Sequence, residues 1–254
     1  MTIIKKCVIM ELLNKVKNMT LNVKKIQFII LALVVLLAGY FGVREFLFNK
    51  PNILESQMAD SFFNFKVVRT DLTNEQIESY RQEFNSDIEE INKTVDRFNF
   101  GAFNNMAMIK QILHDYEGAR DIWQYVGEKR PVNSLSFYNL GLLYANDLKS
   151  NELAEKNLLQ ALKNAEGEAG NEQYYLGIAD FYTYNYPEKI AELEKILLAA
   201  LESEPYKESQ TILTLLATYY QNQGQKQKAL DYWQRVLKID PNSEAVKAAI
   251  KSLK

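Results

Sequence analysis

The stretch ALDYWQRVLKIDP, residues 229–241, has a counterpart earlier in the chain, ARDIWQYVGEKRP, residues 119–131. Both stretches begin with a small residue and place Trp four residues later, Val seven later and Pro twelve later. Two stretches that share four such different residue types at one spacing indicate an internal repeat. Because the chain holds only ten Gly and five Pro in 254 residues, this repeat predicts helical units joined by short connections.

Two further copies are expected between these stretches. Ala119 and Ala229 lie 110 residues apart, which is about three periods of a 34-residue unit. The equivalent positions Ala154 and Leu193 divide this interval into steps of 35, 39 and 36 residues. The longest step predicts about four extra residues in the turn of the third unit, around residues 183–187.

The four units resemble the tetratricopeptide repeat family. The pattern of that family places Leu-Gly or Leu-Ala and then Tyr in a first helix, followed by Ala, an aromatic residue and a closing Pro in the second. Residues 211–243 match it nearly throughout, whereas the first unit carries Lys110 where Tyr is expected. The resemblance implies an all-α fold: a right-handed α-solenoid of about four helix pairs in residues 101–254, ending in a capping helix over residues 242–254.

The small residues of the pattern should let paired helices approach closely, because a larger side chain would hold the two axes apart. These residues are Ala107, Gly141, Gly177 and Ala217. The larger residues of the second helices should fill the space against the neighbouring unit. These are Trp123, Leu158 and Trp233.

A long apolar run precedes the repeats. Residues 26–43 contain no charged residue, and 18 helical residues span about 27 Å, close to the thickness of the hydrocarbon core of a bilayer. We expect a transmembrane signal anchor over residues 26–48, with a cleaved signal peptide as the alternative. Six lysines precede the run, so the Lys-rich residues 1–25 should stay in the cytoplasm and the repeats should lie outside it.

Residues 49–100 are expected to form a helical linker or N-terminal cap. Thr73 and Gln76 have the spacing of a capping box, and an amphipathic helix should follow them. Residues 52–68 are a second candidate helix, whose phenylalanines Phe62, Phe63 and Phe65 should pack on the repeats. A degenerate repeat and a dimer-forming helix are the other interpretations of this region.

The sequence offers little chemistry. It holds one cysteine, Cys7, and one histidine, His114, and it lacks the phosphate-binding, dinucleotide-binding and hydrolase motifs. We therefore expect no catalytic site, no metal, no cofactor and no small-molecule substrate. Residues 44–254 hold 31 acidic and 24 basic residues, and this negative balance argues against a nucleic-acid partner.

A solenoid of this kind usually binds an extended peptide along the concave face formed by its first helices. The predicted groove residues contain amides, tyrosines and apolar groups but no Lys or Arg, so an uncharged peptide segment is the expected ligand. They are Asn104, Asn105, Met108, Gln111, Tyr138, Asn139, Leu142, Asn146, Tyr174, Tyr175, Ile178, Tyr182, Thr214, Thr218, Gln221 and Asn222.

These features predict a non-enzymatic, single-pass membrane protein whose repeats bind protein partners. Its layout is similar to that of the ancillary repeat subunit of the bacterial secretion translocon, which implies a role in envelope assembly or secretion. One alternative is an organelle import receptor with its repeats in the cytosol. Another is the accessory domain of an envelope enzyme.

Overall fold

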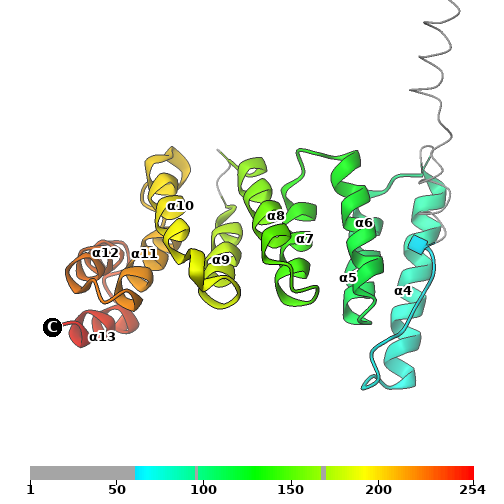
Figure 1. Ribbon diagram of the computed structural model, residues 1–254, viewed down its shortest axis with the longest axis horizontal. Helices are drawn as coiled ribbons and strands as arrows, with labels where there is room; N and C mark the ends of the chain where they lie inside the picture. Colours follow the sequence, from blue (N-terminus) through cyan, green and yellow to red (C-terminus); the bar gives the residue numbers. More distant parts are fainter. Residues whose placement is uncertain (1–60, 95–96, 167–169) are drawn as a thin grey trace, which may run out of the picture. The chain divides into compact units, whose positions relative to one another are not determined.

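The computed structural model describes residues 61–94, 97–166 and 170–254, and its helices all belong to one unit, Asp60–Lys254. Within these residues the fold contains ten α-helices and no strand, which confirms the all-α prediction (Figure 1). The helices are α4 (Asn74–Lys93), α5 (Phe100–Ile112), α6 (Tyr116–Lys129), α7 (Ser134–Asn146), α8 (Asn151–Asn164), α9 (Glu172–Asp180), α10 (Ile190–Glu202), α11 (Gln210–Asn222), α12 (Lys226–Ile239) and α13 (Glu244–Ser252).

Consecutive helices pack as pairs, α5 with α6, α7 with α8 and α11 with α12. The third pair, α9 and α10, touches less directly, because short helical turns lie between its members. At the end of the chain α13 packs on α12 and buries Val246, Ile250 and Leu253, as expected for a capping helix. The handedness of the stack stays a prediction.

The predicted membrane span, residues 26–48, and the Lys-rich residues 1–25 lie outside the described part of the chain. None of the helices that the structure describes between residues 61 and 254 combines the length and the apolarity that crossing a bilayer requires. The anchor therefore remains an expectation from the sequence.

The glycine of the second repeat allows a close approach of α7 and α8. A Cβ atom on Gly141 would lie 2.7 Å from Cγ of Leu158 and 3.0 Å from the backbone nitrogen of the same residue. In the third repeat the reason differs from the predicted one. A Cβ atom on Gly177 would lie 2.4 Å from the ring of Tyr138, so this glycine makes room for the preceding repeat and not for its own partner helix.

The extra residues of the third repeat lie where the spacing predicts them. Helix α9 passes into one turn of π-helix, Phe181–Asn185, which the backbone N–H of Tyr186 closes by donating to the carbonyl of Phe181. A short 3-10 helix, Pro187–Lys189, then leads into α10. The wider π turn absorbs inserted residues without breaking the helix and turns the following side chains to new directions.

The region before the repeats, predicted as a linker or N-terminal cap, contains one well-defined helix, α4. The capping box of Thr73 and Gln76 is confirmed at the start of α4, which packs on α5. The helix expected over residues 52–68 is wrong for residues 64–68, which form no helix; residues 52–60 lie outside the described part. The backbone N–H groups of Val68 and Arg69 donate instead to the carbonyl of Leu113.

The phenylalanines of this segment pack on the first repeat, as predicted. Phe62 is buried and lies 6.2 Å from Phe103 and 5.3 Å from Tyr125 between ring centroids. Phe65 lies 5.5 Å from Phe84 of α4. Aromatic contacts thus fasten the segment to α5, α6 and α4, while its backbone pairs with the turn after α5.

Candidate functional site

The amides of the predicted groove bridge successive first helices. Asn105 on α5 donates to Oε1 of Glu83 and Oδ2 of Asp87 on α4, at 3.0 and 2.8 Å. Asn139 on α7 donates to Oδ1 of Asn104 on α5 at 3.1 Å. Burial raises the pKa of Asp87, and the amide of Asn105 opposes this shift. Side chains expected to meet a peptide therefore already hold one first helix to the next.

The same bridging continues at the ends of the first helices. Gln111 on α5 donates to Oδ2 of Asp147, which follows α7, at 2.7 Å. Asn185 in the π turn donates to Oδ1 of Asn146 at 3.3 Å and to the carbonyl of Ala145 at 3.1 Å. A peptide ligand would have to use the remaining donor and acceptor positions of these amides, since each amide offers several.

Most of the aromatic groove candidates are packed between repeats, and the apolar candidate Ile178 is buried as well. Tyr174, Ile178 and Tyr182 are buried, with 5%, 0% and 1% of their surface exposed. Tyr138 and Tyr175 are half-buried, and Tyr138 stands edge-on to Tyr174 with ring centroids 5.0 Å apart. These tyrosines connect repeats and present little surface to a partner.

The remaining candidates are reachable from solvent. Met108, Thr218, Gln221 and Asn222 are exposed along with Asn146, and Leu142 and Thr214 are half-buried. Gln221 also accepts a hydrogen bond from the indole N–H of Trp233 at 3.1 Å, and Asn104 accepts one from Trp123 at 3.2 Å. The accessible part of the predicted groove thus lies mainly on α11, with Met108 on α5 and Asn146 on α7 as further exposed positions.

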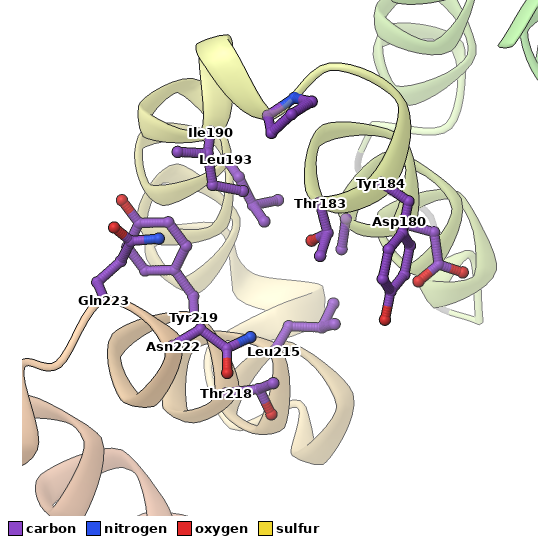
Figure 2. A pocket seen from close by; sticks show the side chains of 12 residues that line it. Asp180, Thr183, Tyr184, Ile190, Leu193, Leu215, Thr218, Tyr219, Asn222 and Gln223 are labelled. Atoms are coloured by element: carbon purple, nitrogen blue, oxygen red, sulfur yellow. The ribbon is translucent and has the colours of Figure 1, made fainter.

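A pocket of about 390 Å³ opens between the third and fourth repeats (Figure 2). Two of the predicted residues, Thr218 and Asn222 of α11, line it. Its other walls come from α9, the π turn, α10 and α11. They are Ala179, Asp180, Thr183, Tyr184, Pro187, Ile190, Leu193, Leu215, Tyr219 and Gln223. The volume falls within the range of about 300–1,000 Å³ that ligand-binding clefts occupy.

Sequence reasoning missed the α9 wall of this pocket. In the third repeat, counting from Gly177 selected Ile178 and Tyr182, which are buried, whereas Thr183 and Tyr184 line the pocket. For residues beyond Asp180 the assignment assumed an uninterrupted α-helix, and the π turn that begins at Phe181 breaks that assumption. Ile178 lies before this turn and is buried within α9. The sequence shows the insertion as the step of 39 residues. It does not show how the insertion changes the directions in which the following side chains point.

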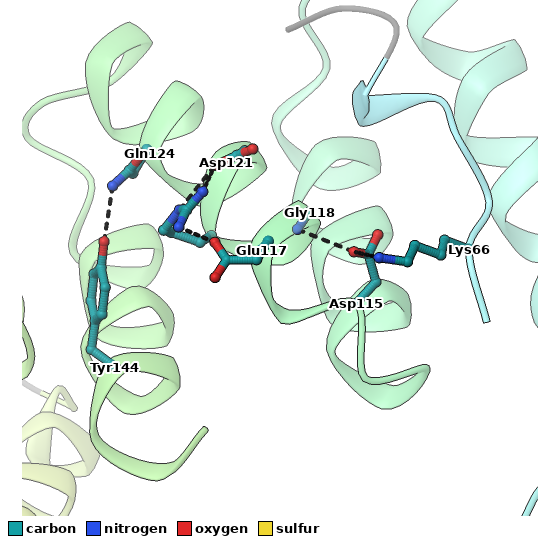
Figure 3. A network of polar contacts seen from close by, with 8 residues as sticks. Lys66, Asp115, Glu117, Gly118, Asp121, Gln124 and Tyr144 are labelled. Atoms are coloured by element: carbon teal, nitrogen blue, oxygen red, sulfur yellow. Dashed lines mark hydrogen bonds and ion pairs between the residues drawn. The ribbon is translucent and has the colours of Figure 1, made fainter. Parts of the chain in front are cut away.

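Asp115, which follows the single histidine His114, has a structural role at the start of α6. Asp115 is the N-cap of α6, and its carboxylate accepts from the N–H of Gly118 at 3.4 Å and from Nζ of Lys110 at 2.8 Å. Lys66 adds an ion pair at 3.9 Å, and Figure 3 shows it approaching from the N-terminal segment. The ring of His114 stacks on Tyr116 instead. Among the described residues no group of three His, Cys, Asp or Glu could hold a metal ion.

Comparison with known proteins finds one matching family model and several solved structures with a similar fold. Residues 211–243 match the model of the tetratricopeptide repeat, and no curated protein matches the chain. YrrB, "a TPR protein with an unusual peptide-binding site", is 18% identical, with 69% of this chain and 88% of YrrB covered and a TM-score of 0.46. A MamA structure (MSR-1) is 15% identical, with 65% and 96% covered and a TM-score of 0.41.

A TPR repeats protein from Bacteroides fragilis NCTC 9343 is 17% identical, with 80% of this chain and 97% of that protein covered and a TM-score of 0.41. Scores below 0.5 give these three likenesses no weight in the argument on function. The assignment rests on the matched repeat at residues 211–243 and on the helix pairs before it. The chain therefore contains a tetratricopeptide repeat at residues 211–243, within a fold of paired helices.

Proposed function

We propose that the protein is a membrane-anchored adaptor that binds protein segments along the first helices of its repeats. The carrying observation is the pocket between α9 and α11, which is lined by groove residues that sequence periodicity selected independently, Thr218 and Asn222. Tetratricopeptide repeats commonly present such surfaces to peptides or partner helices.

The anchor and the side of the membrane are part of the same proposal. Residues 26–48 would cross the bilayer, residues 1–25 would lie in the cytoplasm, and the repeats would act outside it, in the assembly of envelope complexes or in secretion. The uncharged run and the six lysines before it support this orientation. An import receptor would have its repeats in the cytosol, so membrane orientation separates the two functions.

Site-specific photocrosslinking in native membranes tests the adaptor function. A crosslinker at Met108 and another at Thr218, both exposed on first helices, should capture the same partner. A control crosslinker at Lys156, exposed on α8, should not capture it. Equal capture from all three positions, or capture from none, would reject the groove as the binding surface.

Orientation is tested with two reporters fused after Lys254, one active only outside the cytoplasm and one active only inside. Activity of the outside reporter supports the proposal. Activity of the inside reporter alone would place the repeats in the cytosol, as expected for an import receptor. The accessory-domain alternative predicts instead that the purified protein carries an enzyme activity that His114→Ala removes.

A further inference from the structure

The pocket between the third and fourth repeats carries a single ionic side chain. Asp180, at the end of α9, is exposed and is the only charged residue among those that line the cavity. No hydrogen bond or ion pair joins its carboxylate to another residue of the described chain. This exposed carboxylate can therefore pair with a cation brought by a ligand.

Three of the lysines near the pocket in the chain are already paired with glutamates. Lys189 lies 2.6 Å from a carboxylate oxygen of Glu155, and Lys195 lies 2.8 Å from Glu192. Lys228 lies 3.6 Å from Oε1 of Glu194. Neither these lysines nor Lys226, which is exposed three residues after Gln223, forms an ion pair with Asp180 in the described chain. Residues 61–254 as a whole hold 28 acidic and 22 basic residues, a net charge of −6, so the long-range field also favours a cation.

An exposed aromatic ring stands on the same wall of the pocket. Tyr184 follows Asp180 by four residues and is 78% exposed, whereas the other tyrosines of the described residues are buried or half-buried. Figure 2 shows both side chains on one side of the cavity, opposite Thr218 and Asn222 of α11. A carboxylate with an open aromatic face beside it can hold a Lys or Arg side chain through an ion pair and a cation–π contact.

The inner part of the pocket is apolar. Ala179 and Leu193 are buried, and Ile190, Leu215 and Pro187 complete this lining. An aliphatic side chain that entered here would leave water for a hydrocarbon surface, which stabilises binding by about 25 cal/mol for each Å² buried. The pocket therefore offers an apolar subsite beside an anionic, aromatic one.

We propose that this pocket selects partner segments in which a Lys or Arg lies next to an aliphatic side chain. The cation pairs with Asp180 and lies on the ring of Tyr184, while the aliphatic group enters between Ile190, Leu193 and Leu215. This inference deepens the proposed adaptor function and depends on it. It differs from the expectation of an uncharged ligand, because that expectation rested on positions that did not include Asp180.

Peptide selection on the full-length protein in detergent micelles tests the inference. A displayed library of random short peptides is enriched on the wild type and, in parallel, on Asp180→Lys. We expect wild-type selection to favour Lys or Arg beside Leu, Ile, Val or Met, and the variant to lose this preference. The matched control Glu128→Lys changes an exposed carboxylate on α6 and should select the same peptides as the wild type.

One selected peptide is then synthesised with a fluorescent label and titrated by anisotropy. Asp180→Asn and Tyr184→Ala should each weaken its binding by about two- to five-fold, as expected for exposed ion-pair and cation–π contacts. Thr218→Trp, which places a large ring in the mouth of the pocket, should abolish binding. Gln234→Trp, on the exposed side of α12, should leave binding unchanged.

The possible failures are distinguishable. Selected peptides that lack basic residues, or that bind Asp180→Lys as tightly as the wild type, overturn the pocket chemistry and leave the adaptor function standing. Selection of no peptide, together with no shared crosslinked partner at Met108 and Thr218, overturns both. Circular dichroism of each variant confirms that a loss of binding does not come from unfolding.

Discussion

The hydroxyl group of Tyr220 on α11 donates a 2.7 Å hydrogen bond to Oε1 of Glu194 on α10, the second helix of the preceding repeat. The previous repeat boundary has the same arrangement, where Tyr182 donates to Oε1 of Glu155 on α8 at 2.9 Å. Each carboxylate follows directly the core position of its second helix, Leu193 or Ala154. A lysine completes both sites. At both boundaries, consecutive repeats are thus joined by a hydrogen bond from a buried tyrosine hydroxyl to a partly buried glutamate carboxylate.

The substitution Tyr220→Phe tests how the hydrogen bond to Glu194 contributes to stability at acid pH. The hydrogen bond from Tyr220 is the main cause that lowers the pKa of Glu194 below its ordinary value of 4.5. A lowered carboxylate pKa in the folded state contributes stability that is present above pH 4.5 and is lost as the pH falls through the folded pKa. The variant should lose about 1.5–3 kcal/mol of stability at pH 7, and this difference should shrink below pH 4.5.

Urea unfolding at pH 7 and at several values below 4.5, followed by circular dichroism, measures that difference. Tyr184→Phe is the control, because the hydroxyl of this exposed tyrosine has no intramolecular hydrogen bond in the described structure. A difference between wild type and Tyr220→Phe that stays constant over the whole pH range would contradict the proposed coupling.

The substitution Tyr182→Phe tests how the equivalent hydrogen bond, to Glu155, contributes to stability at alkaline pH. Burial, followed by the hydrogen bond to Glu155, raises the pKa of Tyr182 above its ordinary value of 10.0. The folded state then keeps this proton when the unfolded chain has lost it, so stability is full below pH 10 and falls as the pH rises towards the folded pKa. The wild type should lose about 1.4 kcal/mol per pH unit from this residue, and the variant should not. Unfolding midpoints between pH 8 and pH 11 would show the two proteins converging; parallel curves would count against the prediction.

Lys110→Met should destabilise the first repeat strongly. Nζ of Lys110 lies 2.8 Å from Oδ2 of Asp115 and 2.7 Å from the carbonyl oxygen of Asn64, and both charged side chains are buried. Removal of one partner from a buried ion pair costs about 3–5 kcal/mol. The exposed Lys66, 3.9 Å from Asp115, would offset only part of this cost. Lys93→Met, which breaks the exposed pair with Glu90, should cost less than about 1 kcal/mol.

A local readout separates this effect from general unfolding. The amide hydrogens of Val68 and Arg69 donate to the carbonyl of Leu113, beside the buried pair. In Lys110→Met they should exchange with deuterium faster than the amides of α11 do, because the segment loses its anchor on the first repeat. Equal acceleration in both regions would mean that the pair supports the whole stack and not this segment alone.

Gly141→Ala should destabilise the protein although alanine favours helices. The added methyl group would lie 2.7 Å from Cγ of Leu158 and 3.0 Å from its backbone nitrogen, and the backbone of α8 cannot move aside independently. Overpacking of this kind costs about 1–3 kcal/mol, more than the gain of up to about 1 kcal/mol from helix propensity. Gly101→Ala, where the nearest atom would lie 3.5 Å away, should be neutral or stabilising in the same thermal unfolding experiment.

Lys110 illustrates what a departure from the repeat pattern can mean. In the sequence it is a mismatch, a cation where the family has Tyr. In the structure it fills that buried position and reaches a carbonyl in residue 64, which lies 46 residues earlier. No local pattern contains this partner, because the contact exists only after the N-terminal segment folds back on the first repeat.

The groove shows a similar division. Periodicity identified the first helices, and it placed Thr218 and Asn222 correctly at the pocket. It failed for Tyr174, Ile178 and Tyr182, which are buried against neighbouring repeats. Periodicity gives the face of a helix, but the distance to the adjacent helix decides whether that face is open or filled.

The sequence by itself determined the helices, their pairing, the insertion in the third repeat and the close packing at Gly141, because these follow from local periodicity and side-chain size. Only the tertiary structure decided that amides bridge successive first helices, that Lys110 fastens the N-terminal segment, and that a π turn directs Tyr184 into the pocket beside Asp180. These features depend on side chains from separate repeats meeting in space, and a single turn of altered helix geometry is enough to change which ones meet.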